Sequence, residues 1–318
     1  IFSPGDYVLS SSKIINQIKP DLKFEKLKLL MDTENVDFND LKKILKNLNK
    51  LKIHILGDTI IDTNHYCEVI GGLHKTPTLS VVKQISESFL GGAAIVASHF
   101  KSFAKNVTLT TVFSNDEKGK FALKNLKKNK IKINYYSEDD RPTTNKNSYI
   151  VNKHKLLKVD ELNNNTITNY TLDKIIKSLK KDKNQILVFS DFRHGIFNNQ
   201  TLSKIFESIN HKTFKVADSQ VASRWGNISD FKNFDLLTPT EREARYSLFE
   251  QDTPIRNLVG NLQKKSKANN IILKLGEKGL ISISRKKNDY IALDPFVDNL
   301  IDSNGAGDAL LAYSASTL

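Results

Sequence analysis

The stretch Ile53-His54-Ile55-Leu56-Gly57-Asp58 begins the pattern that decides the fold. A short apolar run ends in a small residue and an acidic one, and similar runs recur along the chain. The predicted strands are Ile53–Leu56, Val107–Val112, Ile186–Phe189, Phe214–Ala217, Leu236–Leu237 and Ile271–Leu275. The predicted helices between them are Ala93–Ala104, Lys118–Lys128, Leu172–Lys181, Leu202–Asn210, Glu241–Leu248 and Leu258–Ala268. This alternation predicts an α/β fold in which helices cover both faces of a mainly parallel sheet.

The loops that follow the predicted strands are the expected place for chemistry. In open parallel sheets, ligands bind beyond the carboxyl ends of the strands. Small or polar residues stand at those points, namely Gly57-Asp58, Ser190-Asp191, Asp218-Ser219, Thr238-Pro239 and Gly276. We therefore expect a ligand site along this edge of the sheet.

Two β-rich segments, His65–Lys83 and Thr144–Val159, interrupt the alternation. They could form a small additional sheet that acts as a lid over a bound substrate.

Residues 1–50 differ from the rest of the chain and carry no apparent site chemistry. Lys13–Pro20 reads as a short helix that ends at a proline. A second helix is expected after Asp37, which can cap it. Its apolar residues recur at helical spacing, at Phe38, Leu41, Ile44, Leu45 and Leu48. The segment is best interpreted as a linker or tail.

Composition narrows the class of protein. Of the 318 residues 39% are hydrophobic, which suits a globular protein, and no run of about 18 apolar residues predicts a membrane span. The first residues lack the basic start and apolar core of a secretory signal. Cys67 is the only cysteine, which excludes an internal disulfide and a cysteine-rich metal site. A cytoplasmic location is the resulting expectation.

The net charge of +13 permits two interpretations. A strongly basic chain can bind nucleic acid. Only seven of the 48 basic residues are arginine, however, and arginine is the side chain that nucleic-acid readers favour. A general lysine bias combined with attraction for anionic substrates is the favoured explanation, and a nucleic-acid-binding module is the less favoured one.

The segment Gly305-Ala306-Gly307-Asp308 has residues suited to phosphoryl transfer. Small residues let the backbone approach a ligand closely, and the N–H groups at a helix start favour a negative charge. A carboxylate at Asp308 would be placed to accept a proton from an attacking hydroxyl. The structural alternative is a glycine-rich helix start with an acidic capping residue.

A second glycine turn, Leu90-Gly91-Gly92-Ala93-Ala94, also leads into a predicted helix. Such a turn is as compatible with close packing as with ligand binding. Asp58 and Asp62 follow the first strand, and one of them could bind sugar hydroxyls or both could be solvated.

Taken in order along the chain, these motifs resemble the ribokinase/PfkB family of carbohydrate kinases. The similar segments are Gly57–Asp62, Gly91–Ala94, Ser190–Gly195, Thr238–Glu243, Leu275–Gly279 and Asp302–Asp308. The last resembles the family signature Asp-Thr-x-Gly-Ala-Gly-Asp. The likeness extends to heptose-phosphate kinases, including the kinase domain of ADP-heptose synthase, and to kinases fused to sugar nucleotidyltransferases. It implies a ribokinase-like three-layer αβα sandwich with a small β lid.

The resemblance also implies a role for individual residues. Asp308 would be the general base, and the backbone of Gly305, Ala306 and Gly307 would form the anion hole for the γ-phosphoryl group of ATP. The residues implied to contact the sugar are Asp62, Gly91 and Gly92. The residues implied to bind the nucleotide are Thr240, Glu243, Lys274, Gly276 and Gly279. Glu243 would also organise Mg²⁺, through water.

Four positions depart from the family pattern. Ile95 replaces an asparagine that contacts sugar, and Thr240 replaces an asparagine near the phosphates. Lys274 stands where threonine is common, and it could pair with a phosphate or point to solvent. His194 occupies a position that lysine often holds, and a hydrogen-bonding structural role is favoured for it. A catalytically weak kinase-fold scaffold attached to a nucleotidyltransferase is therefore the alternative hypothesis.

The ends of the chain complete the prediction. Family kinases continue past the signature, so we expect residues 51–318 to be a kinase domain that is incomplete at its C-terminus. The run Ile14–Asp21 resembles the closing stretch of a small nucleotidyltransferase. Residues 1–50 would then be a tail that follows such a domain. The resemblance also makes a homodimer through the lid an expectation.

Overall fold

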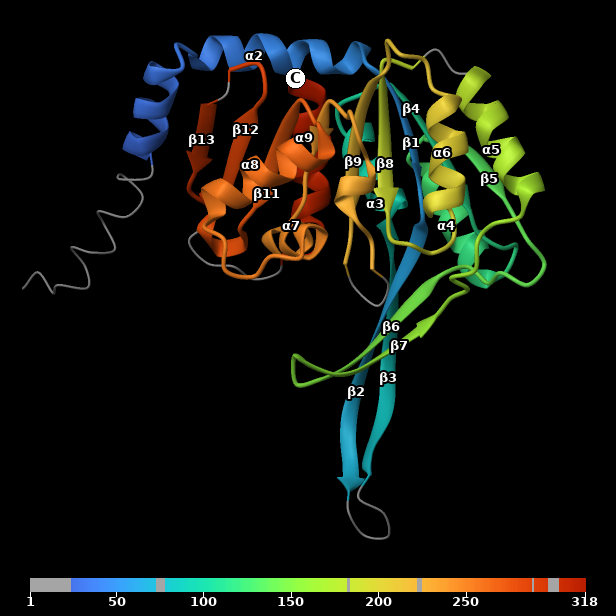
Figure 1. Cartoon of the computed structure of the whole chain (residues 1–318). Coiled ribbons are helices and arrows are strands. Elements are labelled where there is room, and N and C mark those ends of the chain that lie inside the picture. Colours follow the sequence, from blue (N-terminus) through green and yellow to red (C-terminus); the bar gives the residue numbers. More distant parts are fainter. Residues whose placement is uncertain (1–23, 73–77, 182–183, 222–224, 288, 297–302) are drawn as a thin grey trace, which may run out of the picture.

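The body of the protein is a nine-stranded sheet with helices on both faces (Figure 1). The computed structural model describes residues 24–72, 78–181, 184–221, 225–287, 289–296 and 303–318. The strand order is β13-β12-β11-β10-β9-β8-β1-β4-β5, and all neighbours from β11 to β5 run parallel. The strands are β1 (Lys52–Gly57), β4 (Asn106–Val112), β5 (Lys132–Tyr136), β8 (Ile186–Asp191), β9 (Phe214–Ser219), β10 (Leu236–Leu237), β11 (Asn270–Lys274), β12 (Leu280–Ser284) and β13 (Asp289–Leu293).

Two separate hydrophobic clusters fix the helices to the sheet. One cluster holds apolar side chains of α5, α6, α7 and α8, and the other holds those of α3, α4 and α9, so these two sets cover opposite faces. The helices are α2 (Phe38–Asn47), α3 (Ala93–Lys101), α4 (Glu117–Lys128), α5 (Asn169–Lys181), α6 (Asn199–Glu207), α7 (Glu241–Leu248), α8 (Ile255–Ser266) and α9 (Ala306–Thr317). Three short 3₁₀ turns are η1 (Leu48–Lys50), η2 (Ile228–Asp230) and η3 (Gly276–Lys278). The predicted three-layer αβα architecture is confirmed.

Strand β1 lies in the centre of the sheet because its residues can be buried on both faces. It is flanked by β4 and β8 in parallel register. Ile53 and Ile55 belong to the cluster under α3 and α9, whereas Leu56 belongs to the cluster under α5 to α8. The alternation of faces along a strand thus assigns each residue to a cluster.

The two β-rich segments form a second sheet that projects from the body (Figure 1). Its order is β3-β2-β6-β7, made of β2 (Thr59–Gly72), β3 (Leu79–Gly92), β6 (Asn145–Val151) and β7 (His154–Glu161). A separate small sheet was predicted, but β2 and β3 are longer than expected and reach back to the glycine turn at Gly92. We call this sheet the lid.

Several predicted boundaries were wrong for local reasons. Helix α3 ends at Lys101 rather than Ala104, with Ser102 as its C-cap. Helix α8 begins after Pro254 and ends before Lys267, whose φ of 56° is left-handed. Strands β5, β12 and β13 were not predicted, because they are only partly buried and their sequences alternate or are polar.

The N-terminal helices cover the edge of the body opposite the lid (Figure 1). Asp37 forms a capping box with Asp40 at the start of α2, as predicted for this helix. Residues 24–33 form a further helix, and its Lys26 forms an ion pair at 2.7 Å with Asp294, the residue that follows the edge strand β13. The predicted helix at Lys13–Pro20 lies outside the described residues. Among the described helices none is long and apolar enough to cross a membrane.

Candidate active site

Three neighbouring strands end in polar side chains that point to the same side of the sheet. Val216 of β9 and Leu236 of β10 belong to the cluster under α9. Side chains two residues further on share that face. Asp218 and Thr238 therefore point toward α9, and Lys274 at the end of β11 joins them. These ends form the floor of the candidate site.

Lys274 is held by Asp218 rather than by solvent. Its Nζ lies 3.1 and 3.0 Å from the two carboxylate oxygens of Asp218, and only 14% of the lysine side chain is exposed. Burial lowers the pKa of Lys274, but the charges of Asp218, Glu243 and Asp308 outweigh burial and leave that pKa above its ordinary value. The lysine is thus a charged group surrounded by carboxylates, and of its two expected orientations the one toward solvent was wrong.

The start of α9 lies against this lysine. Gly305 precedes the helix with a φ of 79°, a left-handed conformation that glycine adopts without strain. A Cβ atom on Gly307 would lie 3.3 Å from Nζ of Lys274. Gly307 therefore leaves room for the ammonium group beside the first turn, where helix N–H groups favour an anion. Asp302, at the beginning of the signature, lies outside the described residues.

Asp308 lies in the first turn of α9 and has a strongly perturbed carboxyl group. Burial raises its pKa to about 7, and the negative charges of Asp218 and Asp62 add to this effect. The ammonium group of Lys274 opposes them. A carboxylate with a pKa near neutrality is well suited to accept and release a proton.

The start of α7 lies beside the same strands. Thr240 caps the helix and Glu243 completes the capping box, because the Glu243 carboxylate accepts from the Thr240 N–H at 2.7 Å. Thr240 also pairs with Lys274 in an isolated bridge. Burial, and then the charge of Asp218, raises the pKa of Glu243.

The two glycines that follow β11 are explained by different features of the structure. Gly276 has a φ of 62°, and a Cβ atom there would meet nothing within 4 Å, so its backbone is open to a ligand. Gly279 has a φ of 82°, and a Cβ atom there would lie 2.0 Å from the carbonyl oxygen of Leu293. Close packing against the last residue of β13 therefore explains Gly279 without a ligand.

Asp62 and the glycine turn come together through the pairing of β2 with β3. Ile60 is the partner of Gly91 in this register, and a Cβ atom on Gly91 would lie 2.2 Å from a carboxylate oxygen of Asp62. Gly92 has a φ of 57° and precedes α3. The turn is therefore tight because the Asp62 carboxylate lies directly against it.

Asp58 has a structural role, which separates it from Asp62. It is 3% exposed, and its Oδ2 accepts from the N–H groups of Phe192 and His194 at 3.0 and 3.2 Å. Burial, together with the nearby charge of Asp191, raises the pKa of Asp58 to about 7. Asp58 therefore fixes the loop after β8 through these two bonds.

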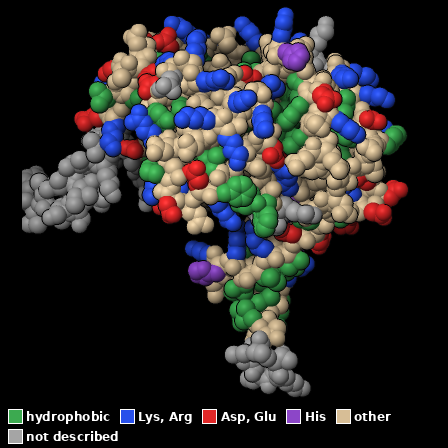
Figure 2. Space-filling view, in the orientation of Figure 1, with side chains coloured by type: hydrophobic (Ala, Val, Ile, Leu, Met, Phe, Trp, Pro, Cys, Tyr) green, Lys and Arg blue, Asp and Glu red, His purple; other side chains and the backbone are tan. Residues whose placement is uncertain are grey.

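Lysines of the lid surround Asp62. Lys146 is its direct partner in the parallel pairing of β2 with β6. Burial raises the pKa of Asp62, and the charges of Lys146, Lys158 and Lys155 oppose that effect. Figure 2 shows basic side chains gathered where the lid leaves the body. The sequence did not reveal this cluster, because its members come together only through strand pairing.

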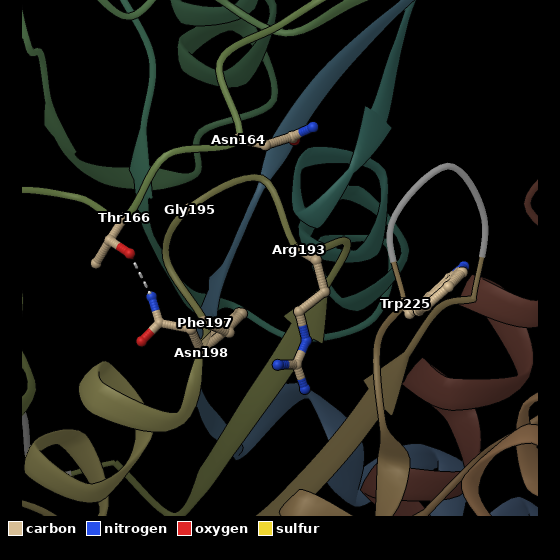
Figure 3. Close-up of a pocket in the computed structure, with 7 residues that line it drawn as sticks. All are labelled: Asn164, Thr166, Arg193, Gly195, Phe197, Asn198 and Trp225. Atoms are coloured by element: carbon tan, nitrogen blue, oxygen red, sulfur yellow. Dashed lines mark hydrogen bonds between the residues drawn. The ribbon is translucent and has the colours of Figure 1, made fainter.

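A cavity of about 550 Å³ lies beside the loop after β8 (Figure 3). Its lining residues are Asn164, Thr166, Arg193, Gly195, Phe197, Asn198 and Trp225. Arg193 is paired with both Asp191 and Asp230, at 2.9 and 2.8 Å. None of the expected site residues lines this cavity, so it is distinct from the candidate active site.

His194 supports the loop through its backbone. It is 5% exposed, its N–H donates to Asp58, and its carbonyl oxygen accepts from Arg141 at 2.9 Å. This agrees with the structural role that we favoured.

Electrostatics connect the two halves of the predicted site. The pKa of Asp308 responds to Asp218 and Lys274 on the strand ends and to Asp62 beside the glycine turn. Residues that are far apart in the sequence are therefore close in the fold. Asp218 was noticed only as a strand-end residue, and its contact with Lys274 was not foreseen.

Known proteins are similar to most of this chain. The chain is similar to the "Bifunctional protein HldE" of Campylobacter jejuni subsp. doylei, with 27% identity over 281 residues. It is also similar to the protein of the same name from Aliarcobacter butzleri, with 25% identity over 280 residues. The match covers 85% of this chain in both cases, but only 57% and 56% of the relatives. The chain thus spans little more than half the length of these curated relatives.

Solved structures share the fold. Ribokinase from Giardia lamblia has a TM-score of 0.66 and 16% identity, covering 84% of this chain and 82% of that one. Escherichia coli phosphofructokinase-2 in complex with fructose-6-phosphate has a TM-score of 0.66 and 15% identity, covering 83% and 86%. Residues 50–318 match the family model for pfkB family carbohydrate kinases. The chain therefore belongs to the pfkB family of carbohydrate kinases.

Proposed function

We propose that this kinase transfers the γ-phosphoryl group of ATP to a hydroxyl of a sugar or sugar phosphate, with Asp308 as the general base. The observation that carries the proposal is the position of Asp308 in the first turn of α9, with its pKa raised to about 7 beside Lys274. A base near neutrality can take the proton of an alcohol as it attacks. The N-terminus of α9 supplies donors for the charge of the phosphoryl group.

The nucleotide would lie along the ends of β10 and β11. Gly276 is open to a close approach, and Thr240 and Glu243 stand at the start of α7. Gly279 would serve this region by fixing the turn against the end of β13. The adjoining backbone of Gly305, Ala306 and Gly307 would form the anion hole.

The donor set fits Mg²⁺ that is held mainly by phosphate. Among the described residues no group of three His, Cys, Asp or Glu side chains could hold a metal ion. Mg²⁺ usually keeps several waters and binds through one or two carboxylates plus substrate phosphates. Glu243 is the carboxylate that would hold it, through water, since it is buried at the start of α7 close to Lys274 and Asp218. Mg²⁺ would supply charge neutralisation on the phosphates.

The acceptor would lie between the lid and the glycine turn. Asp62 would accept from sugar hydroxyls, with Gly91 and Gly92 allowing the sugar to approach the backbone. The cluster of Lys146, Lys155 and Lys158 around Asp62 favours an acceptor that already carries a phosphate, such as a heptose 7-phosphate.

The lid supports a proposal of self-association. Its strands expose large apolar side chains, among them Ile70 (66%), Leu79 (53%), Ile85 (61%) and Phe89 (50%). Such a patch on a projecting sheet is typical of an interaction site. We propose that a second copy of the chain covers it, and sedimentation of the wild type against an Ile85→Lys variant tests this.

The length of the relatives supports a further partner. The chain spans little more than half of the bifunctional proteins that it matches. We propose that a nucleotidyltransferase domain is joined to the kinase domain of residues 51–318, with residues 1–50 as the connecting tail.

A substrate screen tests the proposed function. Purified protein is incubated with Mg²⁺ and ATP and a panel of sugars and their phosphates, and ADP release and phosphorus NMR are recorded. We expect a phosphate ester to form on one acceptor, with higher kcat/KM for phosphorylated acceptors. Binding of ATP with no transfer to any acceptor would instead favour the alternative, a catalytically weak scaffold.

A further inference from the structure

Lys274 occupies a position that a structural ion pair alone does not explain. Its ammonium group donates to the carboxylate of Asp218 and also lies beside Gly307 in the first turn of α9. An ammonium group has three donors, and the two described bonds both go to Asp218. The remaining donor capacity lies next to the helix start where the phosphoryl group would bind.

A second polar group lies at the same strand ends. Thr238 is completely buried, and its Oγ1 has no hydrogen-bond partner among the residues that the structure describes. Buried hydroxyls are normally paired. Thr238 lies on the same face as Asp218 and Lys274, between them in strand order. Both observations point to a polar ligand above the ends of β9, β10 and β11.

A bound polyphosphate would need a positive charge in this region. Asp218, Glu243 and Asp308 all influence Lys274, so a polyphosphate that entered would meet several carboxylates. A lysine that exchanges a carboxylate oxygen for a phosphate oxygen keeps its charge paired in both states. Lysine suits such an exchange because its stem is flexible and its ammonium group is a compact charge.

We propose that Lys274 is a catalytic residue whose ammonium group leaves one oxygen of Asp218 and binds an oxygen of the γ-phosphoryl group at the start of α9. This rests on the proposed function. In the transfer step the acceptor oxygen bonds to the γ-phosphorus, and its proton passes to Asp308. The bond from that phosphorus to the bridging oxygen breaks, and its electron pair leaves with ADP. Lys274 forms no covalent bond and stabilises the charge on the moving group.

The turnover experiment compares four proteins: wild type, Lys274→Met, Lys274→Arg and the double variant Lys274→Met/Asp218→Asn. The double variant is required because Lys274→Met alone leaves Asp218 without its partner. We expect both methionine proteins to lose about 10²-fold or more in kcat, as for loss of one transition-state donor. We expect Lys274→Arg to keep more of the activity, since it retains the charge.

The matched control is Lys287→Met, which removes an exposed lysine paired with Glu34. It should keep wild-type kcat and KM. Thermal unfolding of each variant shows whether the protein is folded at the assay temperature. If the double variant is folded and its kcat is within about threefold of wild type, Lys274 only neutralises Asp218 and the proposal is overturned.

A binding experiment keeps this proposal separate from the proposed function. Affinities for ADP and for a non-hydrolysable ATP analogue are measured by calorimetry, which needs no acceptor. We expect the double variant to lose about tenfold more affinity for the analogue than for ADP, because only the analogue has a γ-phosphoryl group. Equal losses for both nucleotides, or no loss, would contradict the contact even if phosphoryl transfer occurs. Absence of turnover by the wild type would overturn the proposed function whatever the binding result.

Discussion

At the scale of single residues, the site is a set of charges that adjust one another. Burial and the charge of Asp218 raise the pKa of Asp308 to about 7, and the charge of Lys274 limits this increase. The pKa of Asp58 is also raised, but its carboxylate accepts hydrogen bonds from backbone N–H groups and so fixes the loop after β8. Two aspartates with similar pKa values therefore have different roles, which the contacts of each one distinguish.

The pH profile of kcat/KM should carry the titration of Asp308. A general base acts only when it is ionised, and burial raises the pKa of Asp308 to about 7. We expect kcat/KM to fall as the pH drops below about 7 and to level off above it. Because Lys274 lowers this pKa, Lys274→Met should move the acid limb to higher pH. A wild-type profile that stays flat down to about pH 5.5 would show that no group with this pKa acts as the base.

At the scale of elements, the glycine turns position both halves of the site. Gly92 connects β3 to α3 and so places the turn beside Asp62. Gly305 precedes α9 and so places Asp308 beside Lys274. In each case a left-handed residue lets a helix begin beside the ligand-binding edge of the sheet.

Replacement of Gly92 by alanine should destabilise the fold by more than backbone strain alone would, because the new Cβ atom also meets a carbonyl oxygen. Gly92→Ala places a Cβ atom 2.3 Å from the carbonyl oxygen of Asp58, in addition to a φ of 57°. Gly276→Ala is the matched control, because it has a similar φ of 62° and open space around the Cβ atom. From denaturant unfolding we expect a loss of about 1 kcal/mol for the control and about 3 kcal/mol or more for Gly92→Ala. Equal losses would mean that the contact with Asp58 is relieved by a small shift.

The sequence predicted the elements whose signal is local. The buried strand Ile186–Phe189 and the helix Glu241–Leu248 were evident because neighbouring residues determine them. The strand β12 was missed because it is only partly buried and serines alternate with isoleucines along it. Such a strand carries a weaker apolar pattern than a fully buried one.

The site followed the same rule. Asp308 and its glycines were predicted from one short segment, and the structure places them at the start of α9. Lys146 was missed because it is joined to Asp62 only by the register of β2 with β6. The contact of Lys274 with Asp218 likewise depends on the ends of β9 and β11 lying on either side of β10. Contacts of this kind require the fold and cannot be inferred from spacing along the chain.

At the scale of the whole molecule, the lid and the body meet where charge is concentrated. Basic side chains are spread over the face seen in Figure 2, and some gather at this junction beside Asp62. The net charge of +13 therefore has a local counterpart at the end of the site where we propose that the acceptor binds. This distribution is consistent with attraction of an anionic substrate.

The free energy of unfolding should fall as the pH rises, because the pKa of Asp58 is raised in the native state. Its pKa is about 7 in the native state and 3.8 in the reference state, so the native state binds the proton more tightly. The stabilisation is complete below about pH 4 and is lost as the pH rises to about 7. Asp58→Asn removes this titration while its side-chain oxygen can still accept from the loop N–H groups. The free energy of unfolding of the variant, relative to that of the wild type, should increase by about 3 to 4 kcal/mol between pH 4 and pH 8.

Chemical unfolding at several pH values measures this gain. The control is Asp173→Asn on the exposed face of α5, which should change little with pH. A difference between wild type and Asp58→Asn that does not depend on pH would mean that Asp58 titrates normally.

The central claim, that Asp308 is the base of a sugar kinase, is tested most directly by the turnover of Asp308→Asn. Phosphate-ester formation is followed by phosphorus NMR with the best acceptor from the screen, alongside calorimetric ATP binding and with Asp173→Asn as the control. The account predicts a loss of kcat of about 10²-fold or more with ATP affinity within a few-fold of wild type. Turnover by Asp308→Asn at the wild-type rate would contradict it.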